Sequence, residues 1–229
     1  MEKAGLLVEP DFNNPNLYLQ EGVLTKQTEL IKVIAGRFKG KNTEDLLKDL
    51  LVFLNYEVEV KRGVNDPKKF NKSAEEILTS RQRTGCSDSA ILFATLARVM
   101  GVPSMLVVTF DKSWREKVVK GNEPRVTEGH FFVASQIQTG QNAGEWVLID
   151  THNSARNNKL IKFRKLDLDN RNIPWRIGKS MYAFAYVNDI RDIRLNGRTV
   201  DNASNMRYVQ VRAALSSNAK DITSDEFFR

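Results

Sequence analysis

The chain has 229 residues, of which 41% are apolar and 28% charged, with 35 Lys and Arg against 28 Asp and Glu. This balance is typical of a globular protein with a sizeable core, and no apolar run approaches the length of a membrane span. The net charge of +7 is scattered along the chain, which indicates an ordinary charged surface rather than a nucleic-acid-binding block. The single cysteine excludes an internal disulfide and a zinc site made of four thiolates.

The first 24 residues have the pattern of an arm or loop, because they carry Pro10, Pro15 and an Asn-rich patch. The extreme N-terminus contains Glu2 and Glu9, and it lacks the basic start and apolar stretch of a secretory signal. That fits a cytoplasmic protein, and it fits equally a secreted protein whose signal has been removed.

Apolar residues recur at helical spacing in two neighbouring segments. Residues 25–38 form the first predicted helix, which Gly40 ends. Asn42 then provides an N-cap, and Asp45 can return the hydrogen bond three residues later. A second helix follows, and its buried stripe is predicted to contain Leu46, Leu47, Leu50, Leu51 and Leu54.

Two further helices are predicted before the middle of the chain. Ser73 can cap a short helix that carries two glutamates in its first turn. Residues 87–100 are almost all apolar or small, which predicts a helix that is buried on most sides. Gly101 and Pro103 follow in the order that ends a helix.

The pattern then changes to short runs that are rich in β-branched and aromatic residues. These runs predict strands at 105–110, 131–137, 146–149 and 182–187, with a further strand through Tyr208, Val209, Val211 and Ala213. Helices that precede strands indicate an α+β fold, with N-terminal helices packed on a mostly antiparallel β-sheet. We expect an N-terminal arm at 1–24, a single domain at 25–215 and a weakly ordered tail at 216–229.

Cys86 opens the predicted buried helix directly after Gly85. Free backbone N–H groups and the positive end of the helix dipole favour a thiolate at this position and lower the pKa of a cysteine. The alternative is a cysteine that fills the core, since free cysteine is among the most buried residue types. A core cysteine would fit better in the middle of the helix, so we interpret Cys86 as a nucleophile.

A thiol nucleophile needs a nearby base, and the chain has two histidines, His130 and His152. His130 opens a predicted strand after a polar loop. Asp150 ends another predicted strand, where a carboxylate is costly unless it is paired, and pairing with an imidazole would fix the tautomer. His152 competes for Asp150, because the two share a strand face. We prefer His130, because nucleophile, base and acid should come from separate elements.

Several segments together match one known pattern, namely residues 74–78, 83–88, 90, 92–93, 96–98 and 101–103. They resemble the nucleophile helix of the transglutaminase-like superfamily, which is related to the papain-type cysteine enzymes. Residues 130–133 resemble the histidine strand of that family, and residues 146–151 resemble its aspartate strand. Ala134 and Thr151 depart from the acidic residue and the proline that the family often has at these places.

The resemblance implies a transglutaminase-like core with a triad of Cys86, His130 and Asp150. It implies a cysteine-dependent amide hydrolase, of protease or amidase type, that acts through a thioester on a peptide or protein amide. The backbone N–H of Cys86 would form half of an oxyanion hole, and Gln82 is a guess for the other half. No cofactor or metal is expected, since the sequence has no Gly-rich nucleotide loop and no EF-hand loop.

Other activities stay open on the same core. An amine that accepts the acyl group in place of water would make the protein a transglutaminase. Residues 200–201 and 207–208 faintly resemble peptide N-glycanases, although the zinc-binding cysteines of those enzymes are missing here. A non-catalytic module that binds nucleic acid or protein is the alternative of another class; the net charge favours it, whereas the intact Cys, His and Asp oppose it. We expect no membrane span and no nucleic-acid partner.

Overall fold

The computed structural model describes residues 10–38, 40–61, 66–122, 129–152, 164–168, 171–176, 179–195 and 198–216. The helices are α1 (Glu29–Ala35), α2 (Thr43–Glu57), α3 (Ala74–Ser80), α4 (Cys86–Val99), α5 (Lys112–Val119) and α6 (Ala203–Ser216). Short 3-10 helices lie at η1 (Pro15–Leu19), η2 (Gly36–Phe38) and η4 (Ile190–Asp192). The strands are β1 (Glu59–Val60), β2 (Gln82–Arg83), β3 (Ser104–Asp111), β4 (Gly129–Gln136), β5 (Trp146–Ile149), β6 (Arg164–Lys165), β7 (Asn172–Arg176), β8 (Lys179–Val187), β9 (Arg194–Leu195) and β10 (Arg198–Thr199).

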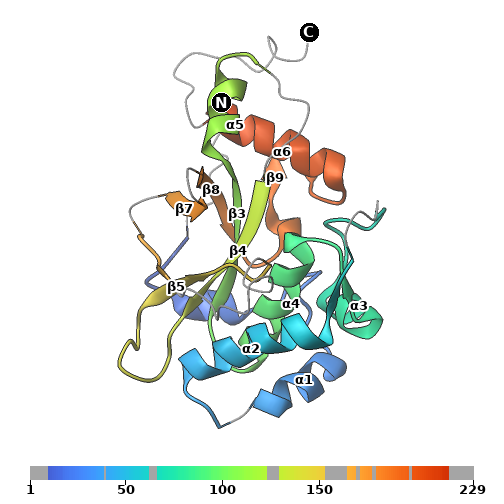
Figure 1. Ribbon diagram of the computed structural model, residues 1–229, viewed down its shortest axis with the longest axis vertical. Helices are drawn as coiled ribbons and strands as arrows, with labels where there is room; N and C mark the ends of the chain where they lie inside the picture. Colours follow the sequence, from blue (N-terminus) through green and yellow to red (C-terminus); the bar gives the residue numbers. More distant parts are fainter. Residues whose placement is uncertain are drawn as a thin grey trace.

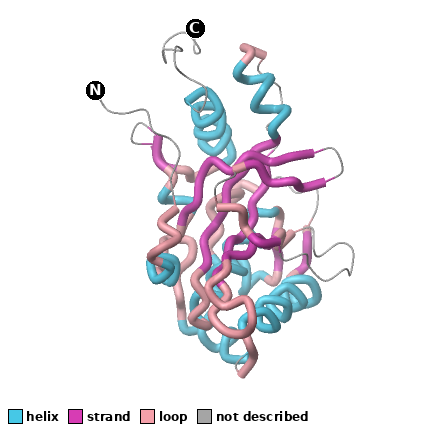
Figure 2. Tube along the Cα trace, turned by 90° about the vertical axis from the view of Figure 1, so that its left-hand side faces the viewer, coloured by secondary structure: helices cyan, strands magenta, loops and turns pink. Residues whose placement is uncertain are grey.

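Six of these strands form one antiparallel sheet in the order β6-β5-β4-β3-β8-β7. The strands curve through the middle of the molecule (Figure 2). Helix α4 packs on β3 and β4, and α1, α2 and α3 pack around α4 (Figure 1). The α+β class and the mostly antiparallel sheet that the sequence predicted are therefore confirmed.

The predicted helix caps are present in the structure. The side chain of Asn42 accepts a hydrogen bond from the backbone N–H of Asp45 at 2.9 Å. Ser73 and Glu76 form a complete capping box at the start of α3. The predicted stripe of α2 is buried, with Leu46 at 7% exposure and Leu47, Leu50, Leu51 and Leu54 at 0%.

Helix α4 is the central helix of the molecule. Every residue from Ser87 to Arg98 is buried, as expected for a helix that is covered on most sides. It ends at Val99, and Gly101 then adopts a left-handed backbone with a φ of 81°. Because α4 spans the interior, its N-terminal residue Cys86 is held against the sheet rather than in solvent.

The segment before α1 covers the second face of the sheet. Tyr18 of η1 is 6% exposed and lies edge-on to Trp146 of β5, with ring centroids 5.6 Å apart. Phe12 packs on the same tryptophan at 5.4 Å. The first predicted helix is also shorter than expected, because the carboxylate of Asp189 accepts hydrogen bonds from the backbone N–H groups of Leu24 and Thr25 and holds this stretch outside the helix.

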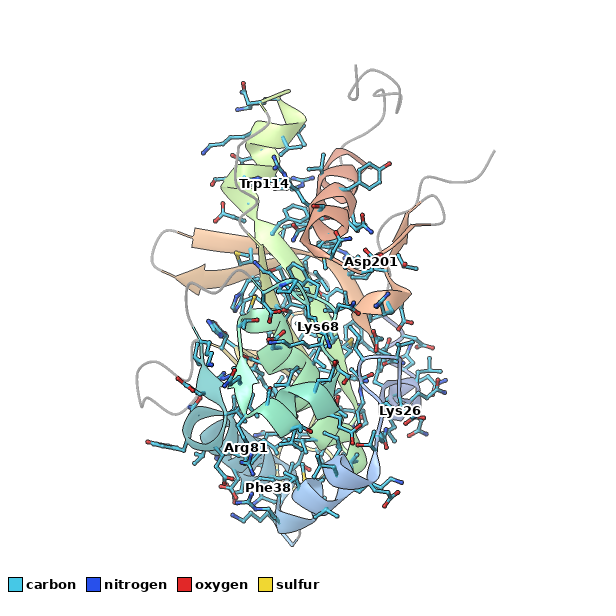
Figure 3. All side chains as sticks on the ribbon, turned by 90° about the vertical axis from the view of Figure 1, so that its right-hand side faces the viewer. Lys26, Phe38, Lys68, Arg81, Trp114 and Asp201 are labelled. Carbon is cyan, nitrogen blue, oxygen red and sulfur yellow. The ribbon has the colours of Figure 1, made fainter. Side chains whose placement is uncertain are left out.

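The strand predicted from Tyr208 to Ala213 is wrong, because these residues lie in helix α6. Asn202 precedes the helix, and its side chain accepts the backbone N–H of Asn205 at 2.9 Å. Met206 and Val209, which are three residues apart, are both 1% exposed, as on the buried face of a helix. Helix α6 packs against α5, and Trp114 of α5 is turned toward it (Figure 3).

Within the described residues, no helix is long and apolar enough to cross a membrane. The tail predicted to be weakly ordered, 216–229, lies outside the described residues except for its first position. The proposed boundaries of an arm at 1–24 and a domain at 25–215 stay predictions.

Candidate active site

Three elements bring Cys86, His130 and Asp150 to one place. Cys86 is the first residue of α4, His130 is the second residue of β4, and Asp150 directly follows β5. Strands β4 and β5 are hydrogen-bonded neighbours, with Val133 opposite Ile149, and α4 packs on β4. This arrangement follows from the pairing of the strands. In an antiparallel pair the first residues of one strand lie beside the last residues of the other, so the start of β4 and the end of β5 lie at the same end of the sheet.

Cys86 is half-buried at the N-terminus of α4. Burial acts to raise the pKa of its thiol, but the charge of His130, a side-chain hydrogen bond with His130 and a backbone hydrogen bond from Phe131 outweigh burial. The pKa of Cys86 is therefore lower than that of an ordinary cysteine. The N-terminal end of a helix acts in the same direction.

His130 lies between the cysteine and a carboxylate. Its Nε2 is 2.9 Å from Oδ1 of Asp150, and its side chain is 4% exposed. Burial acts to lower the pKa of His130, yet the neighbouring Cys86 and Asp150 raise it to about 9. A lowered thiol pKa beside a raised imidazole pKa favours the thiolate–imidazolium form of the pair over the neutral thiol and imidazole.

His152 lies near this pair but occupies a different position. Its ring centroid is 6.5 Å from that of His130, and its Nδ1 is 3.4 Å from the hydroxyl of Ser89. Its backbone N–H donates to Oδ1 of Asp150 at 3.2 Å. The Asp150 carboxylate thus contacts the side chain of His130 and the backbone N–H of His152, which favours His130 as the partner of the carboxylate.

Arg83 is a residue near the site for which the sequence indicated no role. It is 1% exposed, and burial lowers the pKa of its guanidinium to about 10. It donates to the carbonyl of Thr151 at 3.3 Å, to the hydroxyl of Ser89 at 2.9 Å and to the carbonyl of Val58 at 3.2 Å. Arg83 therefore ties the turn after Asp150 to helix α4 and to the end of α2.

A second polar network fixes the segment before Cys86. Asp88 is fully buried and accepts hydrogen bonds from both the backbone N–H and the hydroxyl of Thr84. The Thr84 hydroxyl also reaches Asp66, and Lys72 lies 2.5 Å from Asp66 and 3.7 Å from Asp88. Burial acts to raise the pKa of Asp66, but Lys72 and the backbone of Lys68 bring that pKa below its usual value. The turn at 66–70 is thereby anchored to the cysteine segment.

A pocket of about 270 Å³ opens beside Cys86. The turn at 66–70, residues 84–87, the start of β4 and the first half of α6 contribute to its lining. This volume is close to the lower end of the range for ligand pockets, which starts at roughly 300 Å³.

Gln82, the guess for a second oxyanion donor, lies on β2 and does not line this pocket. Gln210 of α6 does line it, and neither helix propensity nor motif spacing singles out that residue. Within the described part of the chain, no cluster of three or more His, Cys, Asp or Glu residues could hold a metal ion.

Comparison with known proteins identifies the family. The model of the transglutaminase-like superfamily core matches residues 34–151. The fold is similar to that of a candidate cysteine protease from Cytophaga hutchinsonii, with a TM-score of 0.51 and 17% sequence identity over 82% of this chain and 52% of that chain. The chain thus spans about half the length of that protein, and the likeness concerns the fold alone. No curated protein matches the sequence. Since the family model covers just over half of the residues, the chain belongs to the transglutaminase-like superfamily.

Proposed function

We propose that this protein is a cysteine-dependent amide hydrolase in which Cys86 is the nucleophile, His130 the general acid and base, and Asp150 the residue that orients His130. The observation that carries the proposal is the polarised Cys86–His130 pair, whose imidazole also contacts Asp150 at 2.9 Å. A pocket large enough for an amide substrate opens at the same cysteine. Nucleophile, base and orienting acid on separate elements beside a pocket are the features expected of a covalent catalyst.

Acylation follows from this geometry. The Cys86 thiolate attacks the carbonyl carbon of the amide, and the imidazolium of His130 donates its proton to the departing amine as the C–N bond breaks. The product of this half-reaction is a thioester on Cys86. The backbone N–H of Cys86, at the free end of α4, can donate to the oxyanion that forms on the carbonyl oxygen.

Deacylation restores the enzyme. The neutral imidazole takes a proton from water, the hydroxyl oxygen attacks the thioester carbonyl, and the C–S bond breaks to release a carboxylic acid. The thiolate and the imidazolium are then regenerated. Throughout both steps the Asp150 carboxylate stabilises the charged imidazole and fixes which nitrogen faces the sulfur.

The first experiment measures the rate of Cys86 alkylation by iodoacetamide as a function of pH, in the parent protein and in His130→Ala. We expect fast labelling that persists well below the pKa of free cysteine and is lost in His130→Ala, because the thiolate is stabilised by the imidazolium. Slow labelling that rises only near the free-thiol pKa, in both proteins alike, would refute the proposal.

The identity of the acyl acceptor is measured on the same preparation with a peptide amide substrate, in the presence and absence of a primary amine. We expect the free acid as the main product, with Cys86→Ala inactive. A product that incorporates the amine in preference to water would identify an acyltransferase instead.

A further inference from the structure

The pocket beside Cys86 has a positively charged lining. Lys69, from the turn at 66–70, and Arg207, from α6, both contribute to it. None of the described residues that line the pocket is an aspartate or a glutamate. The carboxylates nearest in the chain, Asp66 and Asp88, are already engaged by Lys72 and Thr84. Among the described lining residues, Lys69 and Arg207 therefore present positive charge to a substrate group that enters the pocket.

Lys69 contributes an ammonium group that is available to a ligand. The residue is exposed, and its Nζ lies 5.4 Å from the centroid of the Phe70 ring. Within the described part of the chain, no carboxylate lies within ion-pair distance of this Nζ. Its neighbour Lys68, which Figure 3 labels, differs because its Nζ is 2.6 Å from Glu76 and it does not line the pocket.

The opposite wall of the pocket carries a buried amide. Gln210 of α6 is 4% exposed, and its side chain makes no hydrogen bond with any described residue. The side-chain amide reaches the open space of the pocket, where its N–H group can donate to a ligand or to water.

Gly129 leaves room for this amide directly beside His130. A Cβ atom at position 129 would lie 2.5 Å from Nε2 of Gln210 and 3.2 Å from the carbonyl oxygen of Thr109. Any side chain at position 129 would therefore displace Gln210 from the pocket wall. Gly129, which precedes His130, and Gln210 of α6 therefore fit together as one part of the pocket wall.

We propose that this pocket is a subsite for a carboxylate of the substrate, an inference that rests on the proposed function. Lys69, Arg207 and the amide N–H of Gln210 bind this carboxylate, next to the amide that Cys86 attacks. Two cations and a neutral donor around a cavity of about 270 Å³ suit one carboxylate on a short stem. The carboxylate can belong to an acidic side chain or to the end of a peptide chain.

The test compares the alkylation of Cys86 by iodoacetate, which is an anion, with its alkylation by iodoacetamide, which is neutral and of similar size. The ratio of the two rates measures the attraction of the pocket for a carboxylate and cancels changes in the thiolate population. We expect the ratio to fall about fivefold in Lys69→Gln and in Gln210→Glu, because each substitution changes the local charge by one unit. Lys68→Gln is the matched control, in which the ratio should stay within about twofold of the parent.

A ratio that is unchanged in both Lys69→Gln and Gln210→Glu would overturn the subsite, and so would an equal fall in Lys68→Gln, which would indicate only a diffuse surface field. Failure of the proposed function is a separate result, since it appears as slow labelling by iodoacetamide itself.

A second arm identifies the source of the carboxylate. Short peptides protect Cys86 from iodoacetamide if they bind in the pocket, so we compare an amidated peptide with a glutamate, a glutamine peptide with a free C-terminal carboxylate, and an amidated glutamine peptide. Protection by the first identifies an acidic side chain, and protection by the second identifies a chain end. Equal protection by the uncharged third peptide would contradict the proposal.

Discussion

At the scale of single residues, hydrogen bonds to Asp150 from His130 and His152 explain why the charge of this carboxylate matters. Its Oδ1 accepts from Nε2 of His130 and from the backbone N–H of His152. Asp150→Asn keeps the size of the side chain but removes the charge that stabilises the imidazolium. We expect turnover to fall by about 10² to 10⁴, less than in Cys86→Ser, and the pKa of His130 to fall from about 9. The measurements are turnover and the rate of Cys86 alkylation as a function of pH, and circular dichroism checks that the variant folds. A variant as active as the parent would show that Asp150 does not orient His130.

The three residues of the candidate triad could be nominated from the sequence because each one opens or ends an element. Cys86 follows a glycine at a helix start, His130 opens a strand and Asp150 ends one, so local patterns placed all three. Arg83 and Gln210 could not be nominated in this way. Arg83 acts through contacts with Val58, Ser89 and Thr151, and Gln210 reaches the pocket only because α6 brings it beside Gly129 at the start of β4. Such contacts depend on tertiary packing rather than on local periodicity.

At the scale of elements, Arg83 connects the candidate active site to the helices around it. Its guanidinium donates hydrogen bonds to the turn after β5, to α4 and to the residue after α2. Arg83→Lys replaces the planar guanidinium with a compact ammonium, which cannot reach acceptors that are spread around the plane of the guanidinium. We expect a loss of about 2 kcal/mol in the free energy of unfolding and a roughly tenfold loss in kcat/KM, with a changed alkylation–pH profile. Urea unfolding, steady-state kinetics and the alkylation profile measure these three effects.

Arg98→Lys is the matched control for this change. Arg98 is the other buried arginine of this helical layer, with 3% exposure and a pKa that burial lowers to about 10. It lies near the opposite end of α4, about 18 Å along the helix axis from Cys86, where it donates to the carbonyls of Ser104 and Asn188. We expect similar destabilisation and an unchanged alkylation profile. If both variants shift the profile alike, Arg83 has no special role in positioning Asp150.

The elements themselves were predictable where hydrophobic periodicity and capping agreed. Helices α2, α3 and α4 and strands β3, β4, β5 and β8 lie where the sequence indicated. Helix α6 was mistaken for a strand because residues 209–213 alternate between apolar and polar, with Gln210 and Arg212 on one face, while the cap at Asn202 was overlooked. Helix α5 was missed because its eight residues are mostly polar, although Asp111 caps it through the N–H groups of Ser113 and Trp114.

At the scale of the whole molecule, the sheet that carries His130 needs cover on both faces. The helices cover one face, and the other carries a separate apolar cluster that includes Met105, Val107, Trp146 and Tyr18. No periodicity in residues 10–24 signals this role, because a segment with two prolines that packs through isolated aromatic side chains has no regular pattern. The sequence therefore indicated an arm, and within residues 10–24 it is Tyr18 and the partly buried Phe12 that pack on this apolar cluster.

Tyr18→Ala tests this role of the N-terminal segment. Tyr18 is 6% exposed, packs edge-on to Trp146, and accepts a hydrogen bond from the backbone N–H of Asp11 at 2.7 Å. We expect the free energy of unfolding to fall by about 3 kcal/mol, because removal of a large aromatic side chain leaves a cavity.

The neighbouring Leu17, which is 36% exposed, is the control, and Leu17→Ala should change stability by about 0.5 kcal/mol or less. Urea unfolding of both variants is the measurement. Equal free energies of unfolding in Tyr18→Ala and Leu17→Ala would mean that the packing of this segment on the sheet does not stabilise the fold. A clear difference would make residues 10–24 part of the folding unit that supports the candidate active site.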